Sequence, residues 1–256
     1  MTTATDLSHA QPQAELPPPP PLGSAAGISV FLDFDGTLVE IADRPGGVIV
    51  SPTMPQALAT LSHRLDGRLA LVSGRSLAAL AHLLGPVGLA MAGSHGGEFR
   101  PAGAKVAEAL ADPLPAGVAG ALKQLADAHQ DLVFEEKPFS VAIHYRLRPD
   151  LGPLIAERAA AVAAEYGLLP KHGKMVIELS MPGSDKGNAV ARFMEIPPFA
   201  RTRPLFVGDD VTDEDAFAMV RHLGGEGILV GPLRSTRAHW RLESVAAVHQ
   251  WLEESS

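Results

Sequence analysis

Short apolar runs recur along most of the chain and alternate with stretches whose apolar residues follow a helical period. The runs predict buried strands at residues 28–34, 69–72, 88–92, 204–207 and 227–230. Helical periodicity predicts helices over residues 55–64, 77–84, 185–194 and 213–223. Alternating strands and helices are typical of βαβ units around a parallel sheet. The pattern therefore predicts an α/β fold with a Rossmann-like core.

The pattern changes between about residues 102 and 182. Helical stretches at 118–129 and 151–166 are separated by strand-like runs at 132–135 and 140–146. A possible hairpin near residues 172–173 returns through residues 175–179. We therefore expect residues 102–182 to form an inserted α+β unit, and residues 28–101 and 183–256 to form the core.

The first 27 residues do not follow either pattern. They contain five consecutive prolines at positions 17–21, and proline-rich stretches are typical of extended spacers or disorder. The first basic residue is Arg44, so a positively charged secretory signal is not present. We expect residues 1–27 to be a disordered tail outside the fold.

Composition narrows the classes of function. The 256 residues include 21 Lys and Arg against 29 Asp and Glu, a net charge of −8 without a basic run. This balance argues against a nucleic-acid or anionic-membrane partner. Because the chain has no cysteine, a disulfide scaffold, a thiolate metal site and a cysteine nucleophile are excluded. We expect a cytoplasmic monomer that acts on a small molecule.

Polar residues gather directly after the predicted strands, where ligands bind in open α/β sheets. The strongest signal is Asp33-Phe34-Asp35-Gly36, at the end of the first strand. Two carboxylates at this spacing repel each other unless a cation or a proton separates them. Taken alone, the motif is also compatible with a polar strand end and a glycine turn.

A second signal is a cluster of five acids between Asp209 and Asp215, after the strand at 204–207. Mg²⁺ prefers a few carboxylates together with phosphate oxygens. The spacing of Thr212 and Asp215 also fits a helix-capping box. We assign Asp209 and Asp210 to metal binding, and Glu214 and Asp215 to the helix terminus.

Two further motifs suit an anion. Ser73-Gly74-Arg75 follows a strand, and Lys186 lies in the predicted first turn of a helix, where backbone N–H groups attract negative charge. Either motif alone is also compatible with an ordinary helix start, and Arg75 with a solvated charge.

The four motifs, in this order, resemble the haloacid dehalogenase (HAD) superfamily. The resemblance implies a magnesium-dependent phosphatase in which Asp33 is the nucleophile and Asp35 the general acid and base. It implies phosphate binding by Ser73 and Lys186. It also implies Mg²⁺ on the carboxylates of Asp33 and Asp209 and the backbone carbonyl of Asp35, with Asp210 in support.

The inserted unit carries charged motifs of its own, at Glu135, Lys137, Arg146, Lys174 and Glu178. On alternating strands such residues form either a salt-bridged sheet surface or a site for a polyhydroxylated ligand. With Gly93-Ser94-His95-Gly96-Gly97-Glu98 in the core, they resemble the trehalose-6-phosphate phosphatase family.

This second resemblance implies that the inserted unit is a cap whose five charged residues contact a disaccharide. It implies hydrolysis of trehalose 6-phosphate, the last step of trehalose biosynthesis. A phosphatase for another phosphosugar, such as sucrose 6-phosphate, and a non-catalytic phosphosugar-binding protein are the alternatives. The roles of Asp213, His95 and Glu98 stay open.

Overall fold

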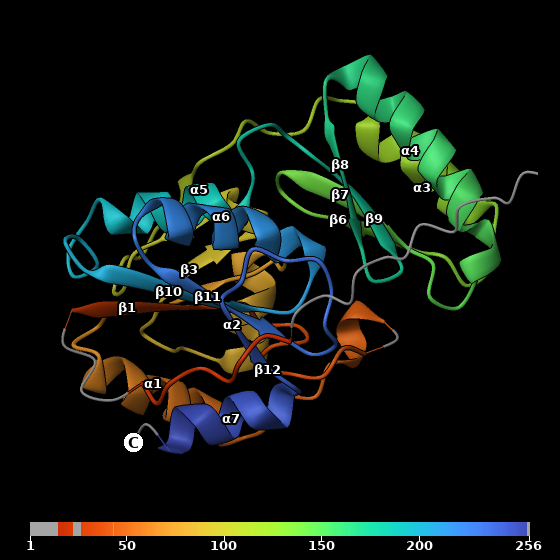
Figure 1. Ribbon diagram of the computed structural model, residues 1–256. Coiled ribbons are helices and arrows are strands. Elements are labelled where there is room, and N and C mark those ends of the chain that lie inside the picture. Colours follow the sequence, from red (N-terminus) through yellow and green to blue (C-terminus); the bar gives the residue numbers. More distant parts are fainter. Residues whose placement is uncertain (1–14, 23–26, 43, 255–256) are drawn as a thin grey trace, which may run out of the picture.

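The protein folds into two lobes, a larger core and a smaller cap (Figure 1). The structure, a computed structural model, describes residues 15–22, 27–42 and 44–254. The core is built on an eight-stranded sheet with the order β12-β11-β10-β1-β2-β3-β4-β5. Its strands are β1 (Ile28–Leu32), β2 (Leu69–Val72), β3 (Ala90–Gly93), β4 (Glu98–Arg100), β5 (Glu108–Ala109), β10 (Arg203–Gly208), β11 (Glu226–Val230) and β12 (Trp240–Leu242).

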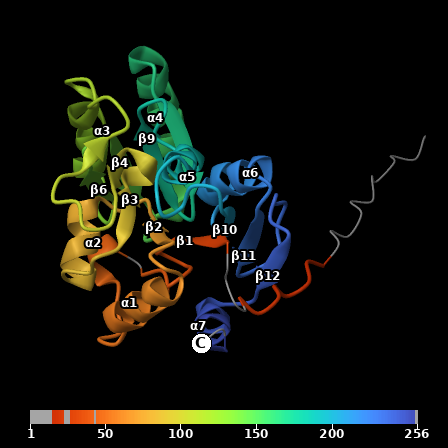
Figure 2. The ribbon, with the colours of Figure 1, turned by 90° about the vertical axis from the view of Figure 1, so that its left-hand side faces the viewer.

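Six neighbouring strands of this sheet, from β12 to β3, run parallel, and β4 and β5 continue the sheet antiparallel. Helices cover both faces (Figure 2). One face carries α1 (Met54–Arg64), α2 (Leu77–Leu84) and α7 (Val245–Glu254), and the other carries α5 (Lys186–Met194) and α6 (Glu214–His222). The predicted α/β core with a central parallel sheet is confirmed.

Alternation along β1 shows why both faces are covered. Val30 and Leu32 pack into one apolar cluster, whereas Phe31 packs into the cluster on the opposite face. There the Phe31 ring lies 5.8 Å from the ring centroid of Phe193 and 5.5 Å from that of Phe199. Since neither face of β1 meets water, its sequence is apolar except for Ser29, whose buried hydroxyl bonds to that of Thr202 (2.6 Å).

The cap has a four-stranded antiparallel sheet with the order β6-β7-β9-β8. Two helices pack on one face of this sheet around a third apolar cluster. The elements are α3 (Val118–Asp127), β6 (Val133–Glu136), β7 (Ser140–His144), α4 (Gly152–Tyr166), β8 (Leu169–Gly173) and β9 (Val176–Ser180). Short 3₁₀ helices complete the chain at η1 (Pro45–Gly47), η2 (Ser94–Gly96), η3 (Pro149–Leu151) and η4 (Val211–Asp213).

The structure differs from the sequence expectations at two places. The core sheet continues through β5 to Ala109, beyond the expected boundary at residue 101, because β5 pairs with β4. Residues 15–22, expected in a disordered tail, lie against the core, where Leu22 is buried. The rest of that tail lies outside the described residues, except for Gly27.

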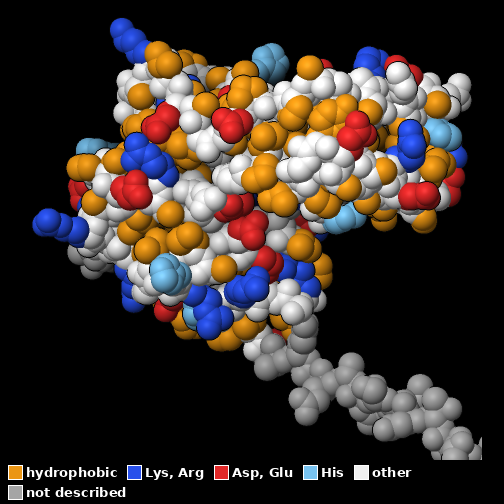
Figure 3. All heavy atoms as spheres, turned by 90° about the horizontal axis from the view of Figure 1, so that it is seen from above, with side chains coloured by type: hydrophobic (Ala, Val, Ile, Leu, Met, Phe, Trp, Pro, Cys, Tyr) orange, Lys and Arg blue, Asp and Glu red, His pale blue; other side chains and the backbone are white. Residues whose placement is uncertain are grey.

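The apolar character of the helices and the distribution of surface charge bear on whether a membrane or a nucleic acid is a partner. Within the described parts of the chain, no helix has the length and apolar character needed to cross a bilayer. On the face drawn in Figure 3, basic and acidic side chains are interspersed over both lobes. That face therefore offers no extended basic surface among the described residues.

Candidate active site

The chain turns sharply after β1 and sends its two acidic side chains to different partners. The N–H of Asp33 still donates to the Val207 carbonyl (2.9 Å), so this residue continues the pairing with β10. Gly36 then adopts a positive φ of 82° and donates its N–H to the Val39 carbonyl (2.7 Å). Consequently Asp33 faces Lys186, whereas Asp35 faces Arg75.

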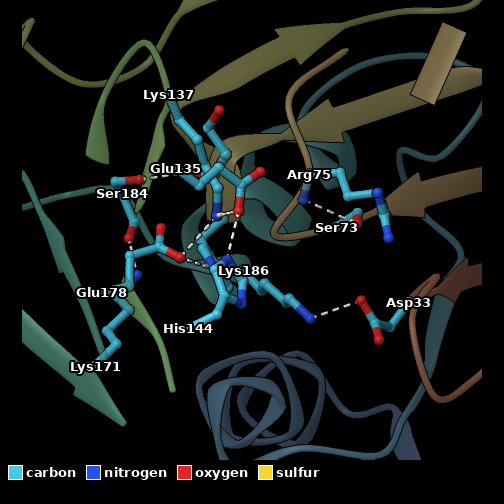
Figure 4. Close-up of polar contacts among 12 residues, drawn as sticks. Asp33, Ser73, Arg75, Glu135, Lys137, His144, Lys171, Glu178, Ser184 and Lys186 are labelled. Carbon is cyan, nitrogen blue, oxygen red and sulfur yellow. Dashed lines mark hydrogen bonds and ion pairs between the residues drawn. The ribbon is translucent and has the colours of Figure 1, made fainter. Parts of the chain in front are cut away.

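Asp33, Asp209 and Asp213 form a buried group that, with Lys186, is named here the core cluster. Carboxylate oxygens of the three acids lie within 4.8 Å of one another. The Lys186 ammonium donates to Asp33 (2.7 Å) and to Asp213 (2.6 Å); Figure 4 draws the first of these contacts. The other oxygen of Asp213 accepts from the backbone N–H groups of Asp209 and Asp210, both at 2.9 Å.

Asp213, whose role the sequence left open, therefore has both carboxylate oxygens engaged. It is fully buried and fixes the Lys186 ammonium beside Asp33. Its two backbone donors lie at the end of β10, so it also shapes the loop that carries Asp209.

The charges of the core cluster do not balance. Burial raises the pKa of Asp33 well above its ordinary value, and although Lys186 opposes this shift, Asp213 and Asp209 add to it. Burial and the charge of Asp213 raise the pKa of Asp209 to about 6. Burial lowers the pKa of Lys186, but Asp213 and Asp33 outweigh it and raise that pKa overall. Even with Lys174, which contacts Asp209 from the cap, three carboxylates face only two ammonium groups.

The donor set fits a hard divalent cation. Asp209 Oδ1 is buried and accepts no hydrogen bond from the described residues, so a strong acceptor is left for a ligand. Its other oxygen contacts the Lys174 ammonium, which comes from the cap. Carboxylate oxygens from Asp33 and Asp209 are the type of ligand that Mg²⁺ prefers.

Gly36 makes the close approach of Asp209 possible. A Cβ atom at this position would lie only 2.2 Å from Asp209 Oδ2, far inside contact distance. The absence of a side chain, together with the positive φ, is therefore required for the packing of the first strand loop against Asp209.

Asp210 lies outside the core cluster. Its side chain accepts from the Val211 N–H (2.7 Å) and forms a capping box with Asp213 at η4. The capping box expected at Thr212 and Asp215 is thus formed two residues earlier, because a 3₁₀ turn precedes α6. The Asp210 carboxylate thus caps the turn that positions Asp209 and Asp213. Asp210 also lines the pocket described below, and its assignment to metal binding stays a prediction.

Arg75 holds Asp35 by both carboxylate oxygens. The two guanidinium nitrogens donate at 2.7 Å, which is the bidentate geometry of a strong charge-assisted pair. Ser73 is buried at the end of β2, and its hydroxyl accepts from the Arg75 N–H (3.1 Å). The sequence left open whether Arg75 is a solvated charge, and its place beside Ser73 was the signal that pointed to the site.

Four cap residues and one core residue form a second group, named here the cap cluster. Buried Glu178 accepts from the Lys137 ammonium (2.8 Å) and from His95 (3.0 Å), and Glu135 pairs with His144 at 2.8 Å (Figure 4). Lys137 also lies 3.8 Å from Glu135. The cluster thus brings together three of the five predicted substrate-binding residues and adds His144, which the sequence reasoning did not assign.

In the cap cluster, Glu178 and Lys137 stabilise each other's charge. Burial alone would raise the pKa of Glu178, but His95 and Lys137 hold it well below its ordinary value. Burial would lower the pKa of Lys137, yet Glu178 and Glu135 raise it overall. The pKa of His95 is lowered by burial, which outweighs the attraction of Glu178.

Arg146 and Lys174, the other two predicted substrate residues, contact the core. Arg146 donates to the backbone carbonyls of Ala42 and Lys174, and the Lys174 ammonium contacts Asp209. Arg146 thus pairs with backbone carbonyls and with no carboxylate of the described residues. Both residues join the cap to the loops around the core cluster.

His95 and Glu98, left open by the sequence, have different roles in the structure. Glu98 accepts from the Ser94 hydroxyl (2.8 Å) and from the Leu77 N–H at the start of α2 (3.0 Å), so it fixes the loop after β3. In that loop Ser94 and His95 have positive φ values of 49° and 53°. This conformation places His95 against Glu178 of the cap.

Both clusters open into one pocket between the lobes. Its lining comes from the carboxyl ends of core strands, from the loop after β1 and from the open side of the cap sheet. It includes Asp33, Asp35, Arg75, His95, Glu135, Lys137, His144, Arg146, Lys174, Glu178, Lys186 and Asp209. The pocket therefore combines the acidic core cluster, which suits a cation, with the preorganised polar side chains of the cap cluster.

Comparisons with known proteins agree with this architecture. The profile of the trehalose-phosphatase family matches residues 31–246. The chain is 37% identical to trehalose-6-phosphate phosphatase of Escherichia coli (strain K12) over 227 residues, which cover 87% of this chain and 84% of the relative. It is 38% identical over 208 residues to a probable trehalose-phosphate phosphatase of Sinorhizobium fredii, covering 80% and 78%.

A solved structure has the same arrangement. The C-terminal domain of Candida albicans trehalose-6-phosphate phosphatase superposes with a TM-score of 0.81 at 25% identity, covering 95% of this chain and 98% of that domain. A sucrose-phosphatase from Synechocystis superposes with a TM-score of 0.60 at 17% identity, which shows a common fold. The family match spans both lobes and the loops that carry the two clusters, and the chain belongs to the trehalose-phosphatase family of the HAD-fold phosphatases.

Proposed function

We propose that this phosphatase hydrolyses trehalose 6-phosphate to trehalose and phosphate through an aspartyl-phosphate intermediate. The observation that carries the proposal is the shared pocket, in which Asp33 and Lys186 lie opposite the Glu135–Lys137–Glu178 group of the cap. The names of the Escherichia coli and Sinorhizobium relatives support this substrate.

In the proposed first step, an oxygen of Asp33 attacks the phosphorus atom and the bond from phosphorus to the sugar oxygen breaks. A carboxylate attacks a phosphate dianion only where positive charge offsets their repulsion. Lys186 supplies one such charge, 2.7 Å from Asp33, and Asp213 holds it there. Ser73, which is buried next to Gly74 and Arg75 of the pocket lining, is proposed to bind a phosphate oxygen.

Asp35 is proposed to protonate the leaving sugar oxygen and then to accept a proton from the water that hydrolyses the acyl phosphate. Because Arg75 holds both oxygens of Asp35, the pair must separate before Asp35 reaches the leaving group. An incoming phosphate competes for the same guanidinium, and so substrate binding itself favours the release of Asp35.

Mg²⁺ is the proposed cofactor, held by Asp33 and Asp209 with the backbone carbonyl of Asp35. When bound, such an ion neutralises charge on the phosphoryl oxygens. Asp209 contributes the buried oxygen without a hydrogen-bond partner, and Asp213 contributes by positioning Lys186 and the loop.

The cap residues are proposed to bind the hydroxyl groups of the disaccharide. Glu135 and Glu178 offer acceptors and Lys137 offers donors, and their mutual contacts hold these groups in place before substrate enters. Arg146 and Lys174 would read the part of the substrate near the core. A preorganised polar site lowers the conformational cost of binding.

A phosphate-release panel tests the proposal. Trehalose 6-phosphate should be hydrolysed far faster than sucrose 6-phosphate or glucose 6-phosphate, and a chelator should stop the reaction until Mg²⁺ is restored. Equal rates across the sugars would contradict the assigned substrate. Phosphosugar binding without phosphate release would instead identify a non-catalytic binding protein. The cytoplasmic, monomeric state expected from composition remains a prediction, of which light scattering tests the second part.

A further inference from the structure

Residues 16–22, named here the proline strap, bury every third side chain. Leu16 is half-buried, and Pro19 and Leu22 are buried, whereas the four prolines between them are exposed. A polyproline II helix has three residues per turn, so residues three apart lie on one face. Because the proline rings fix φ near −65°, the strap is prearranged for this conformation. Its burial pattern indicates that the core contacts one face of a polyproline II helix.

The surface beneath the strap contains both tryptophans of the chain. Trp251 donates its indole N–H to the Pro20 carbonyl (2.9 Å), and Trp240 is oriented by its own N–H bond to Glu226 (3.2 Å). Both indoles line a cavity together with the strap and with Ile28, Leu205 and Ile228. An aromatic groove with an N–H directed at a backbone carbonyl is the chemistry that recognises proline-rich segments.

The strap also covers an edge of the core sheet. β12 is the last strand at its end of the sheet, and its Arg241 N–H donates to the Pro17 carbonyl (3.0 Å). Proline accepts such a bond but has no N–H with which to pair a further strand. The strap therefore satisfies this edge and ends strand pairing there, which protects the sheet from edge-to-edge association. Figure 2 shows the strap, in red, beside β12 and α7.

We infer that this face of the core is a binding site for a proline-rich segment with apolar anchors at positions i, i+3 and i+6. The chain's own strap occupies the site in cis, and five residues separate Leu22 from β1. A segment tethered so closely has an effective concentration of roughly millimolar order.

The site lies away from the candidate active site. Ile28, Arg203 and Glu226 at the amino ends of β1, β10 and β11 line its cavity, whereas Asp33 and Asp209 follow the carboxyl ends of β1 and β10. Its occupant can therefore be tested without altering a residue of the proposed catalytic machinery.

The test compares two variants of the full chain, Pro19→Gly and Pro18→Gly. Each loses one proline, but only Pro19 is buried. Since both tryptophans line the site, their emission reports its occupancy. Pro19→Gly should shift the emission to longer wavelength and speed hydrogen exchange at the Arg241 amide several-fold, while Pro18→Gly stays close to wild type. Phosphate release should be retained by both, which shows that the active site is still folded.

A peptide with the sequence of residues 15–22 is then added to Pro19→Gly. It should restore the short-wavelength emission, a scrambled peptide should not, and wild type should not respond. Equal effects of the two substitutions, unchanged emission in Pro19→Gly, or no response to the peptide would overturn the inference. An emission that depends on protein concentration, with a dimer in sedimentation, would assign the strap to a second copy and overturn binding in cis.

A third variant guards against misfolding of Pro19→Gly. Trp251→Phe keeps an aromatic ring but lacks the N–H that donates to Pro20. Faster exchange at the Arg241 amide supports the inference, and wild-type exchange in this variant contradicts it.

Discussion

The core cluster and the cap cluster both combine buried carboxylates with a lysine, but the pKa values of their carboxylates shift in opposite directions. In the core cluster the buried Lys186 pairs with two of three buried carboxylates, and the pKa values of Asp33 and Asp209 are raised. In the cap cluster Glu178 has a lowered pKa and Lys137 a raised one, because each stabilises the charge of the other. The raised pKa values show that the carboxylates of the core cluster lack compensating positive charge, whereas Glu178 and Lys137 stabilise each other and hold polar atoms in place for a ligand.

The largest expected effect comes from the core cluster. Asp33→Asn should lower kcat by roughly 10⁴-fold or more, since loss of a nucleophile removes the covalent route. The variant should fold, because it removes one of three mutually repelling carboxylates. Steady-state phosphate release and thermal unfolding measure both points, with the exposed Asp127→Asn as the matched control. Retained turnover would exclude Asp33 as the nucleophile, and the core cluster would then have no special role in the chemical step.

Metal removal should act on the core cluster alone. Chelation should lower kcat by about 10²-fold or more, because neutralising phosphoryl charge is worth several kcal/mol. Adding Mg²⁺ should raise the Tm of the wild type by mass action but leave that of Asp209→Asn unchanged. An equal rise of Tm in Asp209→Asn would place the ion elsewhere.

In the cap cluster, Glu178→Gln should raise KM about 10- to 100-fold, with a smaller effect on kcat. Hydrogen bonds to charged groups are worth about 1.5–3 kcal/mol, and the variant leaves the Lys137 ammonium without its closest carboxylate. Glu136→Gln, on the exposed side of β6, is the control and should behave as wild type. A loss confined to kcat would mean that Glu178 belongs to the chemical step.

The smallest expected effect is on the pH dependence of stability. The folded state lowers the pKa of His95, so below about pH 6.5 the unfolded chain binds a proton that the folded chain does not. His95 should therefore lower the free energy of unfolding as the pH falls from 6.5, by at most about 1.4 kcal/mol per pH unit. Asp209, whose pKa is raised to about 6, contributes with the opposite sign in this window.

His95→Asn should remove the His95 contribution to the pH dependence, whereas the exposed His82→Asn should leave the pH dependence as in wild type. Urea unfolding between pH 5 and pH 7.5 provides the measurement. Because the pKa of Glu178 is also lowered, its contribution is present above its ordinary value of 4.5 and is lost only at lower pH. The two residues are thus separable by the pH window, and identical slopes in wild type and His95→Asn would contradict a neutral buried His95.

Local sequence pattern predicted most of the scaffold. The helix at 77–84 coincides with α2, and the apolar run that precedes Asp33 forms β1. Asp209 and Lys186 were identified because each follows a strand or begins a helix, which local sequence encodes. Asp33, Lys186 and Asp209 are brought together by the parallel order of β1 and β10 and by α5, as the βαβ pattern requires.

Long-range pairing was beyond that pattern. Arg75 and Asp35 are separated by 40 positions and His95 and Glu178 by 83, so no local period links them. The role of Asp213 depended on whether the capping box begins at residue 210 or at residue 212. It begins at residue 210, because the 3₁₀ turn η4 precedes α6. The proline strap was expected to be disordered from its composition. Local sequence did not reveal the surface that it contacts, since this surface includes Trp251, more than two hundred residues away.

Gly36 shows that the shape of the site matters independently of its charges. An alanine there would leave every ionisable group in the chain unaltered, yet its methyl group would occupy the space of the Asp209 carboxylate. A count of acids and bases would not register the substitution, although the position of the Asp209 carboxylate would change. The geometry of the site therefore depends on the Cβ atom that Gly36 lacks as much as on the charges around it.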